Sequence, residues 1–217
     1  MPRNSKNWKK NYDYNPTDTS ISNGTLYILL MTRNIMVSSK IVNIVGTSKI
    51  GEDFDLHSLA MSLEGAEYEP EQFPGLIYKI TEPKASFLIF KSGKVVCTGT
   101  TSPSDAQAAL EAASSNLKDI GLDVLPDPKI EIVNIVASGD MKSDNLNLNQ
   151  VAMALGLENI EYEPEQFPGM VYRMNNPKVV TLIFSTGKVI CTGAKNKEDV
   201  EIALTNLHKE LTEHGFL

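Results

Sequence analysis

Two pairs of closely spaced carboxylates come nearest to a catalytic pattern in this sequence. Glu69 and Glu71 lie in the segment EYEPEQFPG, and Glu163 and Glu165 lie in a second copy of the same nine residues. Paired carboxylates can act as acid and base in glycoside hydrolysis, where they flank the bond that breaks. Here they adjoin prolines in a polar turn, where carboxylates are usually solvated. We therefore do not expect an enzyme.

The other reactive side chains do not form a site either. The histidines fall in expected helices without the spacing of metal ligands, and we expect them at the surface; they are His57, His208 and His214. Cys97 and Cys191 lie in the apolar segments GKVVCTG and GKVICTG, a pattern typical of buried free thiols rather than of a disulfide or a metal site. The sequence has no phosphate-binding glycine motif. No cofactor, metal or small-molecule substrate is expected.

An internal repeat dominates the sequence. Glu67–Gly99 returns as Glu161–Gly193 at a constant offset of 94, with 21 of 33 positions identical. The segment IVNIV occurs at Ile41–Val45 and again at Ile132–Val136, at an offset of 91. Such a repeat predicts two similar halves that form one pseudo-twofold object, suited to a partner that is itself roughly twofold.

The repeat divides the chain into an N-terminal extension over residues 1–39, a first repeat over 40–125 and a second repeat over 126–217. The extension has no repeat counterpart and is rich in Asn, Ser, Thr and Lys, so we expect it to be disordered. The alternative is that translation begins at Met31 or Met36, in which case most of the extension is never made.

Each repeat is expected to contain the same elements in the same order. A strand (41–45; 132–136) leads into a short helix capped by Asp55 or Asn147. Three strands follow, over 76–80, 85–90 and 94–98 in the first copy. A longer helix then begins after Ser102 or Asn196 and stops at Gly121 or Gly215. This order predicts an α+β fold in which two repeats share one antiparallel sheet of about ten strands, curved by twist, with helices on one face.

Alternation along the strands divides the side chains of the expected sheet between two faces. One face carries Phe87, Ile89, Val95 and Cys97, and the long helix offers leucines to cover it. The helices cannot cover both faces. The second face is therefore expected to be an exposed surface of Leu, Val, Ile and Phe with almost no carboxylate, and an exposed apolar patch of this kind implies a partner.

The chemistry of this second face suits the minor groove of DNA over A·T pairs. That groove offers only acceptors, so a few Asn and Thr donors suffice, whereas a G·C pair would push its amino group against an apolar surface. Cations at the strand ends can neutralise phosphates, and phenylalanines at the ends of the surface can enter base steps and kink the duplex.

The overall charge argues the other way, because nucleic-acid-binding proteins are usually basic. The formal net charge is −7; residues 1–39 contribute +3 (five Lys/Arg, two Asp) and the remainder 15 − 25 = −10. The two observations agree if the acids lie on the helices and turns, while the second face stays nearly acid-free.

The motifs IVNIV, EYEPEQFPG, PKxxxLIF and GKVxCTG, twice each and in this order, resemble the TATA-box-binding protein family in its archaeal form. The resemblance covers residues 40 to 216 and implies a saddle whose concave sheet grips DNA and whose convex face carries four helices. The family is itself an established example of minor-groove kinking. The 39-residue extension is longer than archaeal members usually have.

The resemblance also implies roles for individual residues. The intercalating phenylalanines are Phe73, Phe90, Phe167 and Phe184. The groove contacts are Asn43, Asn134, Thr98, Thr192, Val45, Val136, Leu88, Leu182, Val96 and Ile190. The phosphate contacts are Lys79, Lys94, Arg173 and Lys188. The loop that docks transcription factor B contains Glu163, Glu165 and Gln166.

The implied function is that of a general transcription factor that binds a TATA-type promoter and recruits transcription factor B and RNA polymerase. We expect a cytoplasmic, nucleoid-associated protein without a membrane span, monomeric on DNA; a homodimer of the free protein through its apolar face stays open. Two alternatives remain. One is an adaptor of the same fold that acts only through protein contacts. The other is an enzyme that uses this fold to bind substrate, which would need a catalytic domain that the sequence lacks.

Overall fold

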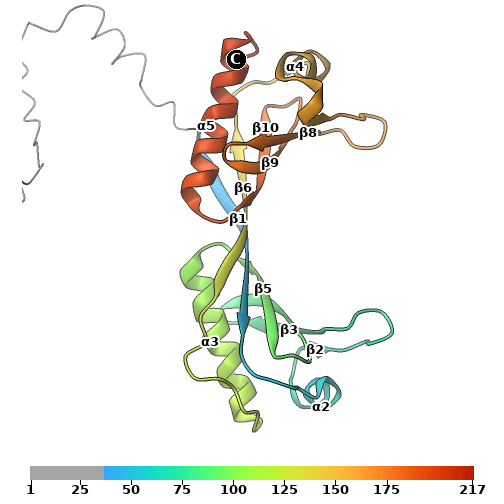
Figure 1. The fold of residues 1–217 in the computed structure, drawn as a ribbon, viewed down its shortest axis with the longest axis vertical. Coiled ribbons are helices and arrows are strands. Elements are labelled where there is room, and N and C mark those ends of the chain that lie inside the picture. Colours follow the sequence, from blue (N-terminus) through green and yellow to red (C-terminus); the bar gives the residue numbers. More distant parts are fainter. Residues whose placement is uncertain (1–36) are drawn as a thin grey trace, which may run out of the picture. The chain divides into compact units, whose positions relative to one another are not determined.

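Ten strands form one curved antiparallel sheet, which confirms the predicted fold class (Figure 1). The computed structural model describes residues 37–217. Residues 1–36 of the predicted extension, including Met31 and Met36, lie outside the described residues. The strand order is β2-β3-β4-β5-β1-β6-β10-β9-β8-β7, so each repeat contributes one half of the sheet.

The strands have the same order in both repeats. The first supplies β1 (Ser39–Lys49), β2 (Ala66–Glu67), β3 (Leu76–Thr81), β4 (Lys84–Ile89) and β5 (Lys94–Thr100). The second supplies β6 (Glu131–Asp140), β7 (Ile160–Glu161), β8 (Met170–Asn175), β9 (Lys178–Ile183) and β10 (Lys188–Ala194). The edge strands β2 and β7 were not predicted, because two residues are too few to show alternation. Strand β1 extends beyond 41–45, since its pairing continues past irregularities at Gly46 that interrupt the alternation.

Four α-helices accompany the described sheet: α2 (Leu56–Ser62), α3 (Pro103–Asp119), α4 (Leu148–Leu155) and α5 (Lys197–Glu213). A short 3-10 helix, η1 (Leu157–Asn159), follows α4. The predicted caps are confirmed: Asp55, Ser102, Asn147 and Asn196 each accept a hydrogen bond from a backbone N–H of the first turn. Helices α3 and α5 run along one side of the sheet, while the loops before β3 and β8 project from the other side (Figure 1).

The two repeats meet where β1 pairs with β6 at the centre of the sheet. In this ladder Ile44 lies opposite Ile135, which is its own counterpart at the offset of 91. The local twofold axis therefore passes between these two residues. Each repeat has its own core under its long helix, but Ile44 of the first repeat is fully buried in the core of the second. Strand β1 thus joins the halves through side chains as well as through backbone hydrogen bonds.

Candidate nucleic-acid interface

The two faces of the sheet differ in burial, as the alternation predicts. In β4, Ala85, Phe87 and Ile89 are at most 3% exposed, whereas Ser86 and Leu88 between them are half-buried. Helix α3 covers the buried face with leucines and alanines that are fully buried. No helix among the described residues packs against the other face. We call that face the open face; it carries the ten predicted groove residues on β1, β4, β5, β6, β9 and β10 and the cross-strand pairs at the ends of the β1–β5 and β6–β10 ladders.

Strand register brings the predicted groove residues together at the middle of the open face. Asn43 of β1 lies opposite Val136 of β6, and Val45 lies opposite Asn134. These four residues surround the local twofold axis. The apolar pairs Leu88–Val96 and Leu182–Ile190 lie opposite each other further out, one pair in each repeat. All ten predicted groove residues are half-buried, which is the burial expected of a sheet face without a covering layer.

The central asparagines are oriented by the backbone. Asn43 Oδ1 accepts a hydrogen bond of 2.9 Å from the N–H of Gly99, and Asn134 Oδ1 accepts one of 2.7 Å from Gly193. Because a backbone N–H can only donate, the amide oxygen must take this position and the amide nitrogen must point elsewhere. The hydroxyl of Thr98 lies 3.1 Å from Nδ2 of Asn43, and Thr192 has the same relation to Asn134 at 3.3 Å. The side-chain NH₂ group of each asparagine is therefore the group that can donate hydrogen bonds at the open face.

An aromatic pair lies in each repeat, next to the turn that closes the β4–β5 or β9–β10 hairpin. The rings of Phe73 and Phe90 meet edge to face at 6.0 Å, and those of Phe167 and Phe184 at 5.9 Å. Phe73 and Phe167 are 38% and 42% exposed, whereas Phe90 and Phe184 are half-buried. A Cβ on Gly75 would lie 2.7 Å from the ring of Phe73, so glycine is needed there to let the ring lie against the chain.

The predicted phosphate contacts are not all free cations. Lys79 forms an ion pair with Glu67 at 3.0 Å, Arg173 with Glu161 at 3.0 Å, and Lys188 with Asp140 at 2.7 Å. Among residues 37–217, Lys94 is the member of the set without such a carboxylate. The expectation that the open face carries almost no carboxylate was wrong at Asp140, which lies beside Lys188 on that face. Strand pairing places Asp140 directly beside Lys188, which the sequence could not reveal because the two residues are 48 positions apart.

The carboxylate pairs of the two EPEQ loops are solvated, as expected. Glu163, Glu165 and Gln166 are all exposed, and the side chain of Gln166 donates to the carboxylate of Glu163. The same bond joins Gln72 to Glu69 in the first repeat. The backbone N–H of Phe167 donates to the carbonyl of Glu163 at 3.0 Å, so the loop is a turn that also holds the aromatic pair. The loop is therefore an exposed acidic turn.

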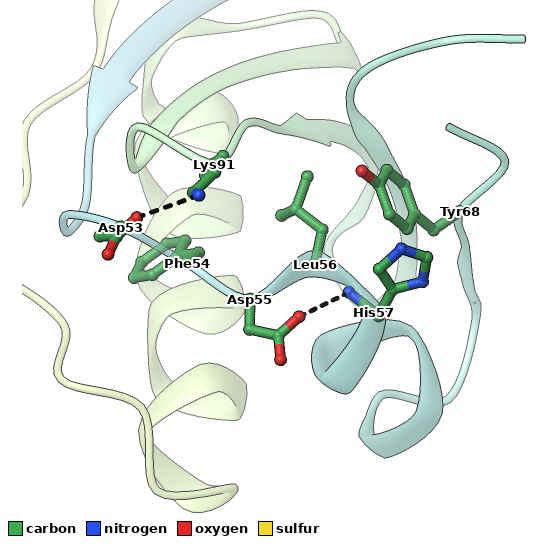
Figure 2. Close-up of a pocket in the computed structure, with 7 residues that line it drawn as sticks. All are labelled: Asp53, Phe54, Asp55, Leu56, His57, Tyr68 and Lys91. Carbon is green, nitrogen blue, oxygen red and sulfur yellow. Dashed lines mark hydrogen bonds and ion pairs between the residues drawn. The ribbon is translucent and has the colours of Figure 1, made fainter. Parts of the chain in front are cut away.

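A pocket beside α2 gathers further titratable side chains (Figure 2). Its carboxylates are already engaged: Asp53 pairs with Lys91 at 3.5 Å, and Asp55 accepts from the backbone N–H of His57 at 3.1 Å. Hydrogen bonds from Ser58 lower the pKa of Asp55, as its role as a helix cap requires. His57 stacks edge to face on Tyr68. We find no nucleophile or oriented acid–base pair in this pocket.

The two thiols are buried and unpaired, as expected. Burial raises the pKa of both Cys97 and Cys191 to about 11. In the described part of the chain, no group of three or more His, Cys, Asp or Glu could hold a metal ion. None of the helices in residues 37–217 combines the length and the hydrophobicity of a membrane span.

The fold and the open face define a class of α+β proteins in which two repeats share one antiparallel sheet and leave one of its faces uncovered. The family model that matches the chain is described as transcription factor TFIID (or TATA-binding protein, TBP), and it matches twice, over residues 38–120 and 129–214. The chain belongs to this family, which is one of transcription factors rather than of enzymes.

Archaeal proteins are among the most similar relatives. The TATA-box-binding protein of Haloarcula marismortui is 51% identical over 180 residues, which cover 83% of this chain and 96% of the relative. That of Archaeoglobus fulgidus is 50% identical over 178 residues, covering 82% and 97%. Among solved structures, Methanococcus jannaschii TBP aligns with a TM-score of 0.73 at 50% identity, covering 81% of this chain and 99% of that one. The resemblance seen in the motifs is confirmed.

Proposed function

We propose that the open face binds the minor groove of A·T-rich, TATA-type promoter DNA, and that the protein is a general factor of transcription initiation. The observation that carries the proposal is the orientation of Asn43 and Asn134, whose oxygens are held by backbone N–H groups. Their N–H donors are presented at the centre of an otherwise apolar surface. The A N3 and T O2 atoms of the minor groove are acceptors, which these donors match.

The apolar residues around the asparagines supply the selectivity against G·C pairs. Leu88, Val96 and their counterparts Leu182 and Ile190 have no group that could accept a hydrogen bond from the amino group of guanine. A guanine there would bury an unsatisfied donor, which costs about 1–3 kcal/mol. Substituting one A·T pair over these residues should therefore weaken binding by roughly fivefold or more.

The aromatic pairs supply the bend. Phe73 and Phe167 are exposed and lie in the loops before β3 and β8, near opposite ends of the sheet, where a duplex lying along the open face would meet them. Inserting such rings between base steps unstacks them at a cost of a few kcal/mol, which is offset when the kinked duplex contacts more protein. Residues Phe90 and Phe184 pack against the exposed rings and complete the two wedges.

The acidic EPEQ loop of the second repeat is the proposed docking site for transcription factor B, through which RNA polymerase is recruited. Its exposed Glu163 and Glu165 favour a basic partner surface. The protein is proposed to act as a monomer on DNA in the cytoplasm, associated with the nucleoid. An adaptor without DNA binding is the alternative, and the exposed aromatic pairs argue against it because a protein-only adaptor has no need of two symmetric wedges.

The deciding experiment measures binding and bending together. Energy transfer between labels at the two ends of a short duplex is compared for a TTTATA-type site and for a copy in which the A·T pairs are replaced by G·C. We expect tight binding with a large bend on the A·T duplex alone. Binding of neither duplex by the folded protein would favour the adaptor, and equal binding of both would refute the groove assignment.

A further inference from the structure

The last cross-strand pair of the open face has a different charge in the two repeats. Lys49 lies opposite Lys94 at the end of the β1–β5 ladder. At the equivalent end of the β6–β10 ladder, Asp140 lies opposite Lys188. The offsets that relate the repeats, 91 for Lys49 to Asp140 and 94 for Lys94 to Lys188, make the two pairs equivalent in position. One cross-strand pair therefore consists of two cations, and the other consists of a cation and an anion.

The two-lysine end has no fixed counter-charge. Like charges directly opposite on a sheet are destabilising, so this pair is relieved when an anion lies between them. Lys49 does contact Glu52 at 2.5 Å, but the Glu52 side chain is 76% exposed and belongs to a neighbouring turn, so it can be displaced at little cost. Within residues 37–217 no carboxylate lies within ion-pair distance of Lys94.

In the second pair, the carboxylate that faces Lys188 is held in place. Asp140 accepts from Lys188 Nζ at 2.7 Å, from the backbone N–H of Lys142 at 2.9 Å and from Lys142 Nζ at 3.3 Å. Its side chain is only 25% exposed. The hydrogen bond from Lys188 is the main reason why the pKa of Asp140 lies well below its usual range. A phosphate that approaches Lys188 must therefore compete with the charged carboxylate of Asp140 for this lysine.

We infer that Lys49 and Lys94 together form a phosphate clamp, and that Asp140 makes the equivalent end of the sheet the weaker of two electrostatic anchors for DNA. This inference rests on the proposed function, since its ligand is the phosphate backbone of the bound duplex. Lys49 is a phosphate-binding residue that the symmetric set of Lys79, Lys94, Arg173 and Lys188 does not include.

The position of the clamp ties it to one of the two kinks. The backbone N–H of Phe90 donates to the carbonyl of Lys94 at 2.9 Å, so the clamp lies within one turn of the first aromatic pair. Lys91, in the same turn, pairs with Asp53 at 3.5 Å and is not part of the clamp (Figure 2). DNA is therefore held more firmly beside Phe73 and Phe90 than beside Phe167 and Phe184.

The test compares the salt dependence of binding for single variants of the full chain on the A·T duplex. The logarithm of the binding constant falls as the logarithm of the salt concentration rises, and each phosphate contact adds about 0.9 to the magnitude of this slope. Lys49→Gln and Lys94→Gln should each lower the slope by nearly that amount and weaken binding by roughly fivefold to tenfold at about 0.1 M salt. Lys188→Gln should change the slope by less than half as much, and Asp140→Asn should tighten binding and steepen the slope.

Two controls separate this inference from general charge effects and from misfolding. Lys118→Gln makes the same change in net charge on α3, on the far side of the sheet, and should leave the slope unchanged. Lys49→Arg keeps the charge and should bind like the parent protein. A slope that is unchanged by Lys49→Gln, or lowered equally by Lys188→Gln and Lys94→Gln, would overturn the inference while leaving the proposed function standing. Failure of the parent protein to bind the duplex would instead remove the proposed function, and the inference with it.

Discussion

Asn43 holds the N–H of Gly99 with its amide oxygen at 2.9 Å, and this one bond fixes the polarity of the amide at the centre of the open face. Without it, the oxygen and the nitrogen of the side chain could exchange places. Asn43, which is proposed to contact DNA, thus also accepts a hydrogen bond from the neighbouring strand β5. Substitution can separate its role in DNA binding from its role in stability.

Asn43→Asp and Asn43→Ala should therefore have different effects. Aspartate keeps an acceptor for the Gly99 N–H, so the free energy of unfolding should stay close to that of the parent protein, but the donors are lost and binding of the A·T duplex should fall at least tenfold. Alanine leaves the N–H without a partner and should also lower the stability by about 1–3 kcal/mol. Urea unfolding and duplex binding measured side by side test both, and equal stability of the two variants would contradict the assignment.

Phe90→Ala and Phe184→Ala should each reduce the bend and the affinity without unfolding the protein. Both residues are half-buried at the open face and support the exposed rings of Phe73 and Phe167. Phe87→Leu is the matched control, because Phe87 is 1% exposed on the opposite face. It should lower the melting temperature but leave the bend measured by end-to-end energy transfer unchanged. An undiminished bend in Phe184→Ala would refute the wedge assignment.

Reversing charge in the second EPEQ loop should separate DNA binding from partner recruitment. The double variant Glu163→Arg, Glu165→Arg alters two exposed side chains away from the centre of the open face. It should bind the duplex as tightly as the parent protein but recruit transcription factor B at least tenfold more weakly, as measured by gel shift of the ternary complex. The same reversal at Glu69 and Glu71 is the control from the first repeat. Equal loss from both loops would show that recruitment depends on total charge rather than on this site.

The buried thiols should resist modification until the protein unfolds. With a pKa of about 11, only about one thiol in a thousand is ionised near pH 8, and burial hides it further. We expect Cys97 and Cys191 to react with a thiol reagent only as fast as the protein opens, and both to react at once in denaturant. Rapid labelling of the native protein would contradict the packing of β5 and β10.

Asp140 gives a prediction for acid stability. Its pKa is lowered in the folded protein, mainly by Lys188, from a usual value of 3.8. The stabilisation from its charged form is therefore complete above that value and is lost as the pH falls below it. The parent protein should lose stability more steeply than Asp140→Asn between about pH 4 and pH 2. Parallel stability curves for the two proteins over this range would show that the ion pair adds nothing.

The sequence predicted the fold well because the repeat supplies each signal twice. The caps at Asp55, Ser102, Asn147 and Asn196 and the buried face around Phe87 depend on local patterns, and all are present in the structure. The ion pairs could not be predicted in this way. Lys188 meets Asp140, and Arg173 meets Glu161, only through strand register, which local patterning does not specify across long connections.

The pairing of Ile44 with its own counterpart, Ile135, gives the junction of the two repeats the symmetry of a dimer interface. An antiparallel contact between equivalent residues is the geometry of a symmetric homodimer. A single repeat would therefore carry everything needed to build the same sheet by meeting a second copy of itself. Two identical copies, however, must evolve together, because every substitution appears on both sides. In a single chain the two equivalent positions can differ, as Lys49 and Asp140 do.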